Sequence, residues 1–147
     1  MAEITRQGNA QWNGDLKTGQ GSTSTASGSL REVPYSVPSR FETGKGTNPE
    51  ELIAAAHASC FSMMLAKILG DQGAKANRIS TRATLTMRVD SSGAKITKLH
   101  LATEIAAEGM SAEKVQQAAA QAKDQCPVSQ LLKPGLENLS FEAKLVS

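Results

Sequence analysis

The sequence predicts an α+β fold built around one long apolar helix. Three patterns lead to this prediction. Residues 49–70 are apolar or small on nearly every face of a helix, which is typical of a buried helix. Two later segments alternate apolar and polar residues, as half-buried strands do. A narrower helical pattern and one more alternating segment follow, so the elements come in the order β…α…ββ…α…β.

Length and composition indicate a single domain over residues 1–147 that is able to bury a core. Hydrophobic residues make up 39% of the chain but aromatic residues only 3%, so the core must be aliphatic and lean. A subunit interface would add buried area. The net charge is +2, and acids and bases are interleaved, so there is no basic stripe to bind nucleic acid.

The residues at the start of the chain predict a soluble, cytoplasmic protein. They contain no apolar segment of the kind found in a secretory signal. The long helix is too polar to be assigned as a membrane span, because it contains His57, Lys67 and many Ala and Ser residues. In the cytoplasm two cysteines are more often catalytic or redox-sensing than joined in a stable disulfide.

The first forty residues predict short strands and loops. Residues 3–12 alternate loosely and suggest a strand, and residues 19–29 suggest a short strand followed by a Gly/Ser/Thr-rich loop. Pro34 and Pro38 within residues 33–41 place any strand there at a sheet edge or interrupt it. The Gly44-Lys45-Gly46-Thr47 segment lacks the spacing of a phosphate-binding loop, so no nucleotide cofactor is expected.

The central helix has clear end signals. Thr47 or Asn48 can cap its first turn, and Pro49 suits the first helical position. Glu50 and Glu51 place negative charge near the positive end of the helix dipole. Gly70 is the expected C-cap.

The second half of the chain predicts a hairpin, a helix and a last strand. Residues 79–89 and 96–106 flank the turn at 90–93 and should pair as an antiparallel ribbon. Ser111 should cap a helix that ends near Gln125. Its apolar stripe consists of Val115, Ala118, Ala119 and Ala122. A short turn begins at Cys126-Pro127, and residues 139–145 form the last strand.

The two cysteines occupy different local settings. Cys60 lies in the middle of the apolar helix, where a thiol commonly serves as a small hydrophobe. Cys126 directly precedes Pro127 at a predicted helix N-terminus, where unpaired N–H groups favour the thiolate, although Cys126 can also be a plain capping residue. The chain has no other thiols, so a redox pair is a hypothesis worth testing; the spacing is not that of a Cys-x-x-Cys motif.

A buried thiol needs a nearby cation to become a reactive thiolate. Arg40, in a predicted short loop before the helix, is the candidate, with a solvated surface arginine as the alternative. Glu50 or Glu51 could hold its guanidinium through a bidentate pair. Glu50 and Cys60 are ten positions apart, or about 15 Å along one helix. If both serve one site, either Arg40 bridges the gap or a second subunit contributes.

No metal site is expected. His57 lies three positions before Cys60 and could face the same way, but such a histidine is usually a hydrogen-bonded core residue. A zinc site built from His57, Cys60, His100 and Cys126 is conceivable, yet no pair among them has the spacing of a structural zinc site.

A family resemblance rests mainly on two segments of the chain. They are the residues from Asn48-Pro49-Glu50 through Cys60-Phe61, and Cys126-Pro127-Val128-Ser129. With the early Gln11-Trp12 and the segment 39–42, they resemble the OsmC/Ohr family, the osmotically inducible protein C and organic hydroperoxide resistance proteins. The resemblance covers essentially the whole chain. The arginine just ahead of the helix is similar to that of the OsmC branch.

The resemblance implies an antioxidant thiol peroxidase that reduces organic hydroperoxides and, more weakly, hydrogen peroxide. It implies an intertwined homodimer with two central helices packed with antiparallel sheets and active sites at the interface. Cys60 would be the peroxidatic thiolate, Cys126 the resolving thiol, Arg40 the activating cation and Glu50 its partner. A dithiol such as a lipoyl group would reduce the resulting disulfide. The alternative is a redox-sensing or ligand-binding dimer that uses the same thiols without turnover.

Overall fold

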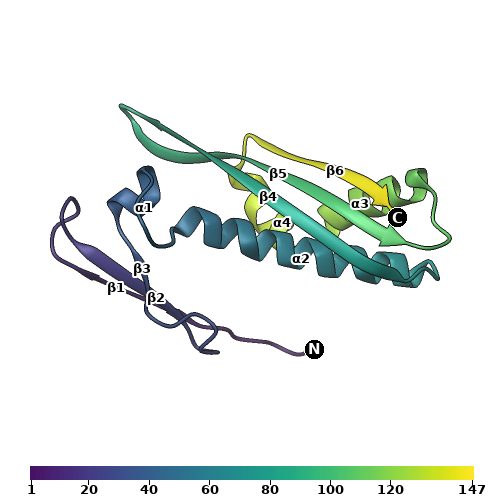
Figure 1. Cartoon of the computed structure of the whole chain (residues 1–147), viewed down its shortest axis with the longest axis horizontal. Helices are drawn as coiled ribbons and strands as arrows, with labels where there is room; N and C mark the ends of the chain where they lie inside the picture. The colour runs from purple at the N-terminus through teal and green to yellow at the C-terminus, as the bar shows by residue number, and fades with distance from the viewer. The chain divides into compact units, whose positions relative to one another are not determined.

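The computed structural model describes all residues 1–147, and they form two compact units, 1–52 and 53–147. Figure 1 labels the elements along the chain. The first unit contains a three-stranded antiparallel sheet and one short helix. Its elements are β1 (Gly8–Asn13), β2 (Gln20–Thr25), β3 (Val33–Tyr35) and α1 (Val37–Phe41).

Two expectations for the first unit need correction. The first strand begins at Gly8 rather than at residue 3. The segment expected as an interrupted strand over 33–41 is a strand for three residues only and then becomes α1, so Arg40 lies on a helix and not in a loop. A reciprocal capping box explains α1: Ser36 Oγ accepts from the Ser39 N–H at 3.2 Å, and Ser39 Oγ accepts from the Ser36 N–H at 2.8 Å.

The central helix, α2 (Pro49–Asp71), begins as predicted, because Asn48 Oδ1 accepts from the Glu51 N–H at 2.8 Å. The helix ends at Asp71, and the prediction that Gly70 is its C-cap was wrong. Gly70 lies inside the helix, and Gly73 takes the left-handed conformation with φ +79°. The N–H of Ala74 donates to the Leu69 carbonyl and that of Gly73 to the Gly70 carbonyl, which together form a Schellman motif.

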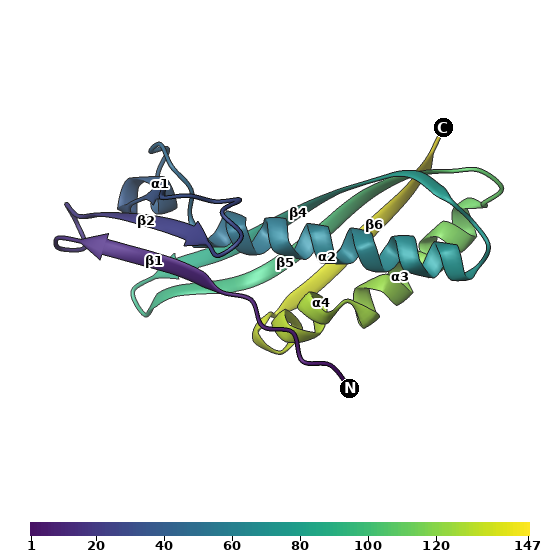
Figure 2. The same cartoon turned by 90° about the horizontal axis from the view of Figure 1, so that it is seen from below.

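The second unit has two layers, a sheet with helices on one of its faces (Figure 2). The sheet order is β4-β5-β6. The β4–β5 pair is the predicted antiparallel hairpin, whereas β5 and β6 are parallel because the chain crosses over between them through helices. The elements are β4 (Ala76–Asp90), β5 (Gly93–Ala107), α3 (Ala112–Gln125), α4 (Pro127–Leu132), the 3₁₀ turn η1 (Lys133–Gly135) and β6 (Asn138–Val146).

The hydrophobic core of the second unit lies between α2, α3 and the inner face of β5. The strand pattern predicted this face: Leu99, Leu101 and Ile105 are buried. The narrow stripe predicted for α3 is buried in full, and Ser111 caps that helix by accepting from the Lys114 N–H at 3.2 Å. Phe61, Leu65 and Leu69 contribute the α2 side of the core.

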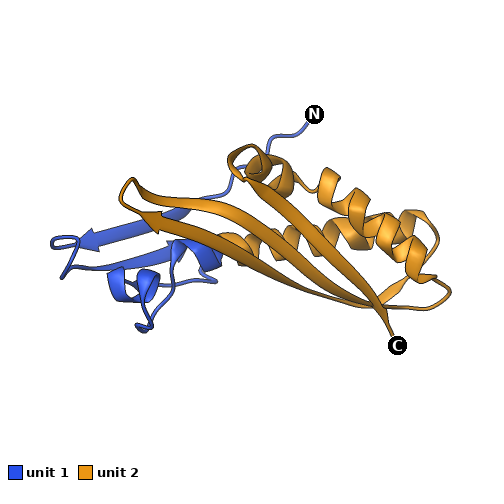
Figure 3. Cartoon of the chain, turned by 90° about the horizontal axis from the view of Figure 1, so that it is seen from above, with its two compact units in different colours: residues 1–52 blue, residues 53–147 orange.

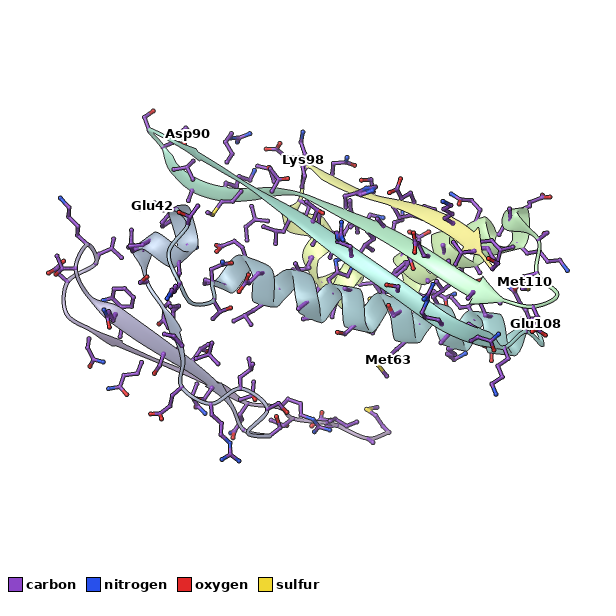
Figure 4. All side chains as sticks on the ribbon, in the orientation of Figure 1. Glu42, Met63, Asp90, Lys98, Glu108 and Met110 are labelled. Carbon is purple, nitrogen blue, oxygen red and sulfur yellow. The ribbon has the colours of Figure 1, made fainter.

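One side of α2 is exposed in the single chain. The prediction that this helix is buried on nearly every face is therefore wrong for one chain by itself. Met63 is 75% exposed, and Figure 4 shows it projecting from α2 on the side away from β4. By length and composition alone, α2 could cross a membrane. Of its most apolar 18-residue stretch, 33% is buried inside the chain. The same test is met by core helices of soluble proteins, and α2 contributes Phe61 and Leu65 to this core.

Candidate active site

The two thiols, 66 positions apart in sequence, meet inside the second unit. Cys60 projects from α2 and is half-buried, and Cys126 is fully buried between α3 and α4. Cys126 Sγ donates to Cys60 Sγ at 3.0 Å, and both cysteines are free thiols. The fold therefore creates a dithiol that no local sequence motif encodes.

The backbone around Cys126 fixes its position from both sides. Its N–H donates to the Ala122 carbonyl at 2.8 Å, which closes α3, and its own carbonyl accepts from the Gln130 N–H at 3.0 Å, which opens α4. Pro127 occupies the first position of α4, as predicted, where a missing N–H costs nothing. One residue thus serves as C-cap of one helix and N-cap of the next, which fixes the backbone from which the Cys126 side chain projects.

The surroundings of Cys60 disfavour its thiolate. Burial raises the pKa of the Cys60 thiol above its ordinary value, and the neighbouring Cys126 sulfur acts in the same direction. The backbone N–H of Val128, in the first turn of α4, donates to the Cys60 sulfur and lowers the pKa, but burial is the larger effect. A further positive charge is needed to make Cys60 a reactive thiolate at neutral pH.

A cation fixed by a carboxylate lies in the first unit. The Arg40 guanidinium donates to Glu50 through Nη2 at 2.7 Å and through Nε at 3.0 and 3.2 Å to the two carboxylate oxygens. The Arg40 side chain is 39% exposed and that of Glu50 12%. Glu51 instead accepts from Thr47 Oγ1 at 2.6 Å, so Glu50 is the partner of Arg40. An arginine held in this way retains free N–H donors for another anion.

His57 is the hydrogen-bonded core histidine that the sequence predicts, whereas its partner Ser129 was not predicted. His57 Nε2 lies 2.6 Å from Ser129 Oγ, and both residues are buried. The sequence does place Ser129 in the first turn after Cys126-Pro127 and His57 one turn before Cys60. What it does not show is that α4 packs against α2. The other histidine, His100, lies on β5 with Nδ1 2.8 Å from Ser140 Oγ.

The apolar cavity of the second unit is not lined by the residues that follow Cys60 in the sequence. Phe61 is fully buried in the core and Met63 is exposed, so neither forms a pocket wall within the chain. This cavity of about 120 Å³ lies between Ile53 of α2 and Leu132 of α4, and residues from β4, β5 and the η1 region complete its lining.

Comparison with known proteins places the chain in a family context. A family model described as OsmC-like protein matches residues 42–137, which include Glu50 and both cysteines, while Arg40 lies two positions before the match. The chain is 47% identical over 141 residues to Peroxiredoxin OsmC of Escherichia coli (strain K12), covering 96% of this chain and 98% of that protein.

More distant relatives agree with this assignment. Organic hydroperoxide resistance protein-like 1 of Staphylococcus saprophyticus is 31% identical over 108 residues, covering 72% of this chain and 75% of that protein. The crystal structure of the organic hydroperoxide resistance protein OhrB of Bacillus subtilis superposes with a TM-score of 0.71, at 23% identity, covering 97% of this chain and 98% of that one. The latter similarity establishes the shared fold.

Proposed function

Because the chain belongs to the OsmC-like protein family and is a peroxidase, we propose that it reduces organic hydroperoxides, and hydrogen peroxide more weakly, through the thiol of Cys60. The observation that carries this proposal is the 3.0 Å separation of the Cys60 and Cys126 sulfurs. A sulfenic acid formed at Cys60 has a second thiol within reach. Cys60 is also the more accessible of the two, and a peroxide must reach the sulfur it oxidises.

The reaction balances in three steps. The Cys60 thiolate attacks one peroxide oxygen, the O–O bond breaks, and an alkoxide leaves that takes up a proton to become the alcohol; Cys60 is now a sulfenic acid. The Cys126 thiol condenses with it to form a disulfide and releases water. An external dithiol then transfers two electrons and two protons, restoring both thiols and becoming a cyclic disulfide. A lipoyl group has the right chemistry for this last step.

Arg40 is the residue we assign to activating the thiolate, and Glu50 to holding Arg40 in place. Burial raises the pKa of Cys60, so the thiolate requires a permanent cation, and arginine cannot lose its proton. The same guanidinium can stabilise the negative charge that develops on the leaving oxygen. The Arg40 involved belongs either to the same chain or to a second copy.

We propose that the preferred substrate is an organic rather than an inorganic peroxide, with its carbon part in the apolar cavity beside Leu132 and Ile53, which lies two helical turns before Cys60 on α2. The cavity volume of about 120 Å³ suits a short alkyl chain or part of a longer one. Because its walls are aliphatic, it would favour the carbon part of an alkyl hydroperoxide over water.

We propose that the active form is a cytoplasmic homodimer in which residues 1–147 act as one functional domain. The exposed face of α2 carries Ala55, Ser59, Met63, Ala66 and Gly70, which are small or apolar and spaced three or four positions apart. The first unit buries no large apolar side chain of its own. Both features are those of surfaces completed by a second copy of the chain.

The decisive experiment is mass spectrometry after one equivalent of an alkyl hydroperoxide has been added to the reduced protein. We expect a Cys60–Cys126 cross-link, no cross-link with Cys60→Ser, and an oxidised Cys60 without cross-link in Cys126→Ser. Sustained peroxide consumption with dihydrolipoamide then establishes turnover. Oxidation that stops after one equivalent would instead identify a redox sensor.

A further inference from the structure

A buried histidine and a buried serine lie beside the two thiols and take no part in the reaction steps above. His57 and Ser129 are 0% and 1% exposed, and His57 Nε2 lies 2.6 Å from Ser129 Oγ. His57 Nδ1 is buried and has no hydrogen-bond partner. A polar contact sealed inside an apolar core stabilises one relative position of its two elements, because breaking it leaves buried groups unpaired.

The contact joins the two segments that hold the thiols. His57 lies one helical turn before Cys60 on α2, and Ser129 lies three positions after Cys126 in the first turn of α4. Two further polar contacts cross the same interface: Cys126 Sγ to Cys60 Sγ, and the Val128 N–H to the Cys60 sulfur. Of the three, the His57–Ser129 contact is the one that does not involve a reacting sulfur, so it can persist while Cys60 changes oxidation state.

The hydrogen bond between His57 Nε2 and Ser129 Oγ uses one ring nitrogen and leaves the other, Nδ1, without a partner. Which of the two bonded atoms donates depends on the tautomer of the ring. Burial lowers the pKa of His57, which keeps the ring neutral and suits this arrangement.

The α4 segment needs such an anchor. It is six residues long, shorter than a helix that is stable on its own, and its Leu131 is 77% exposed. Its position against α2 must come from contacts such as the packing of Val128 and Leu132 and the buried hydrogen bond of Ser129. Apolar packing tolerates small sliding movements, whereas a hydrogen bond fixes a distance and a direction.

We propose that His57 and Ser129 are positioning residues whose hydrogen bond holds the Cys126–Ser129 segment against α2, so that Cys126 stays within reach of oxidised Cys60. This inference rests on the proposed function. It concerns the second step, in which the Cys60 sulfenic acid and the Cys126 thiol form a disulfide and release water. If that step slows, a second hydroperoxide oxidises the sulfenic acid to sulfinic acid and is itself reduced to the alcohol.

The test measures how strongly the fold favours the Cys60–Cys126 disulfide, by equilibrating the protein with mixtures of reduced and oxidised dithiothreitol. No peroxide is involved. Ser129→Ala is expected to lower the disulfide equilibrium constant by about 5- to 100-fold, because it leaves the buried Nε2 of His57 unpaired and loosens α4. His57→Gln, whose amide can donate or accept from nearly the same place, should retain most of the wild-type value.

A matched control lies on the same helix. Ser62 Oγ donates to Thr81 Oγ1 of β4 at 2.7 Å, so Ser62→Ala removes a part-buried hydrogen bond of α2 that does not reach α4. It should leave the disulfide equilibrium unchanged. A second variant, His57→Leu/Ser129→Ala, leaves no unpaired polar group and keeps the test valid if Ser129→Ala does not fold; it should show the same loss of disulfide.

A second readout uses excess alkyl hydroperoxide followed by mass spectrometry. Ser129→Ala should accumulate Cys60 sulfinic acid several-fold faster than the wild type or Ser62→Ala. The inference is overturned if Ser129→Ala and the double variant match Ser62→Ala in both assays while the wild type still turns over peroxide. If the wild type forms the disulfide in the redox buffer but does not turn over peroxide, the proposed function fails, and the dithiothreitol equilibrium alone decides the positioning role.

Discussion

The two units of this chain, shown in two colours in Figure 3, bury different kinds of side chain. In residues 1–52 the buried side chains are the polar Ser39 and Thr47. In residues 53–147 an aliphatic core surrounds Phe61 and reaches Cys126. The second unit is thus stabilised chiefly by burial of apolar surface, and the first by sheet and side-chain hydrogen bonds, which contribute less per residue.

This difference separates the two halves of the proposed chemistry. The cation and its carboxylate, Arg40 and Glu50, lie in the polar unit, where a charge remains partly hydrated. Both thiols lie in the apolar unit, where burial raises the pKa of Cys60. Substitutions in the first unit should therefore change activity more than stability, while core substitutions in the second should change stability first.

The largest expected effect compares two phenylalanines. Phe61→Ala, at a fully buried position in the second unit, should lower the free energy of unfolding by about 3–5 kcal/mol, because it leaves a cavity in the core. Phe41→Ala, at a 45% exposed position in the first unit, should change it by less than about 1 kcal/mol. Urea unfolding measures both. Equal losses would show that the two units are packed alike.

Arg40→Ala tests the reverse case, a large change in rate with a small change in stability. Loss of the charge that stabilises thiolate and leaving oxygen should lower the rate of peroxide reduction by about 100- to 1000-fold. Its ion pair with Glu50 is partly exposed and should contribute no more than about 1 kcal/mol to stability. Arg31→Ala, a surface arginine of the same unit, is the control; wild-type activity in Arg40→Ala would remove Arg40 from the mechanism.

Met63→Glu tests whether a second copy covers the exposed face of α2. A carboxylate placed in an apolar interface should raise the dimer Kd by about 100-fold or more, because it must lose its hydration. Analytical ultracentrifugation measures the change. Val89→Glu, at another exposed apolar position but on β4, should leave the dimer intact. A dimer unaffected by Met63→Glu would place the interface elsewhere.

The smallest expected effect is a pH dependence that originates in the second unit. Burial lowers the pKa of His57 below its ordinary 6.5, so between these two pKa values the unfolded chain binds a proton that the folded chain does not. Stability should therefore fall as the pH drops below about 6.5. Urea unfolding at several pH values should show a shallower slope in His57→Gln than in the wild type. His100→Gln serves as the control for loss of a histidine.

Much of the fold could be predicted from local patterns. The N-caps of α2 and α3, the β4–β5 hairpin and the buried stripe of α3 follow from end signals and periodicity over a few residues. The errors also have local causes. Pro34 and Pro38 predict an interrupted strand, whereas the Ser36–Ser39 capping box starts α1 two residues after Pro34. Gly70 is the predicted C-cap, but Gly73, three positions later, adopts the left-handed conformation.

The sequence by itself determined the candidate reactive groups: two thiols in distinct local settings, one arginine before the helix, and a carboxylate in its first turn. Such assignments need only residue type and neighbours in the chain. The family resemblance implied the Cys60–Cys126 pair and the Arg40–Glu50 pair, and the tertiary structure shows both contacts. Tertiary structure alone decided that His57 reaches Ser129. That contact joins two elements packed through an apolar core, and apolar packing is non-directional, so no short stretch of sequence specifies which polar atoms it brings together.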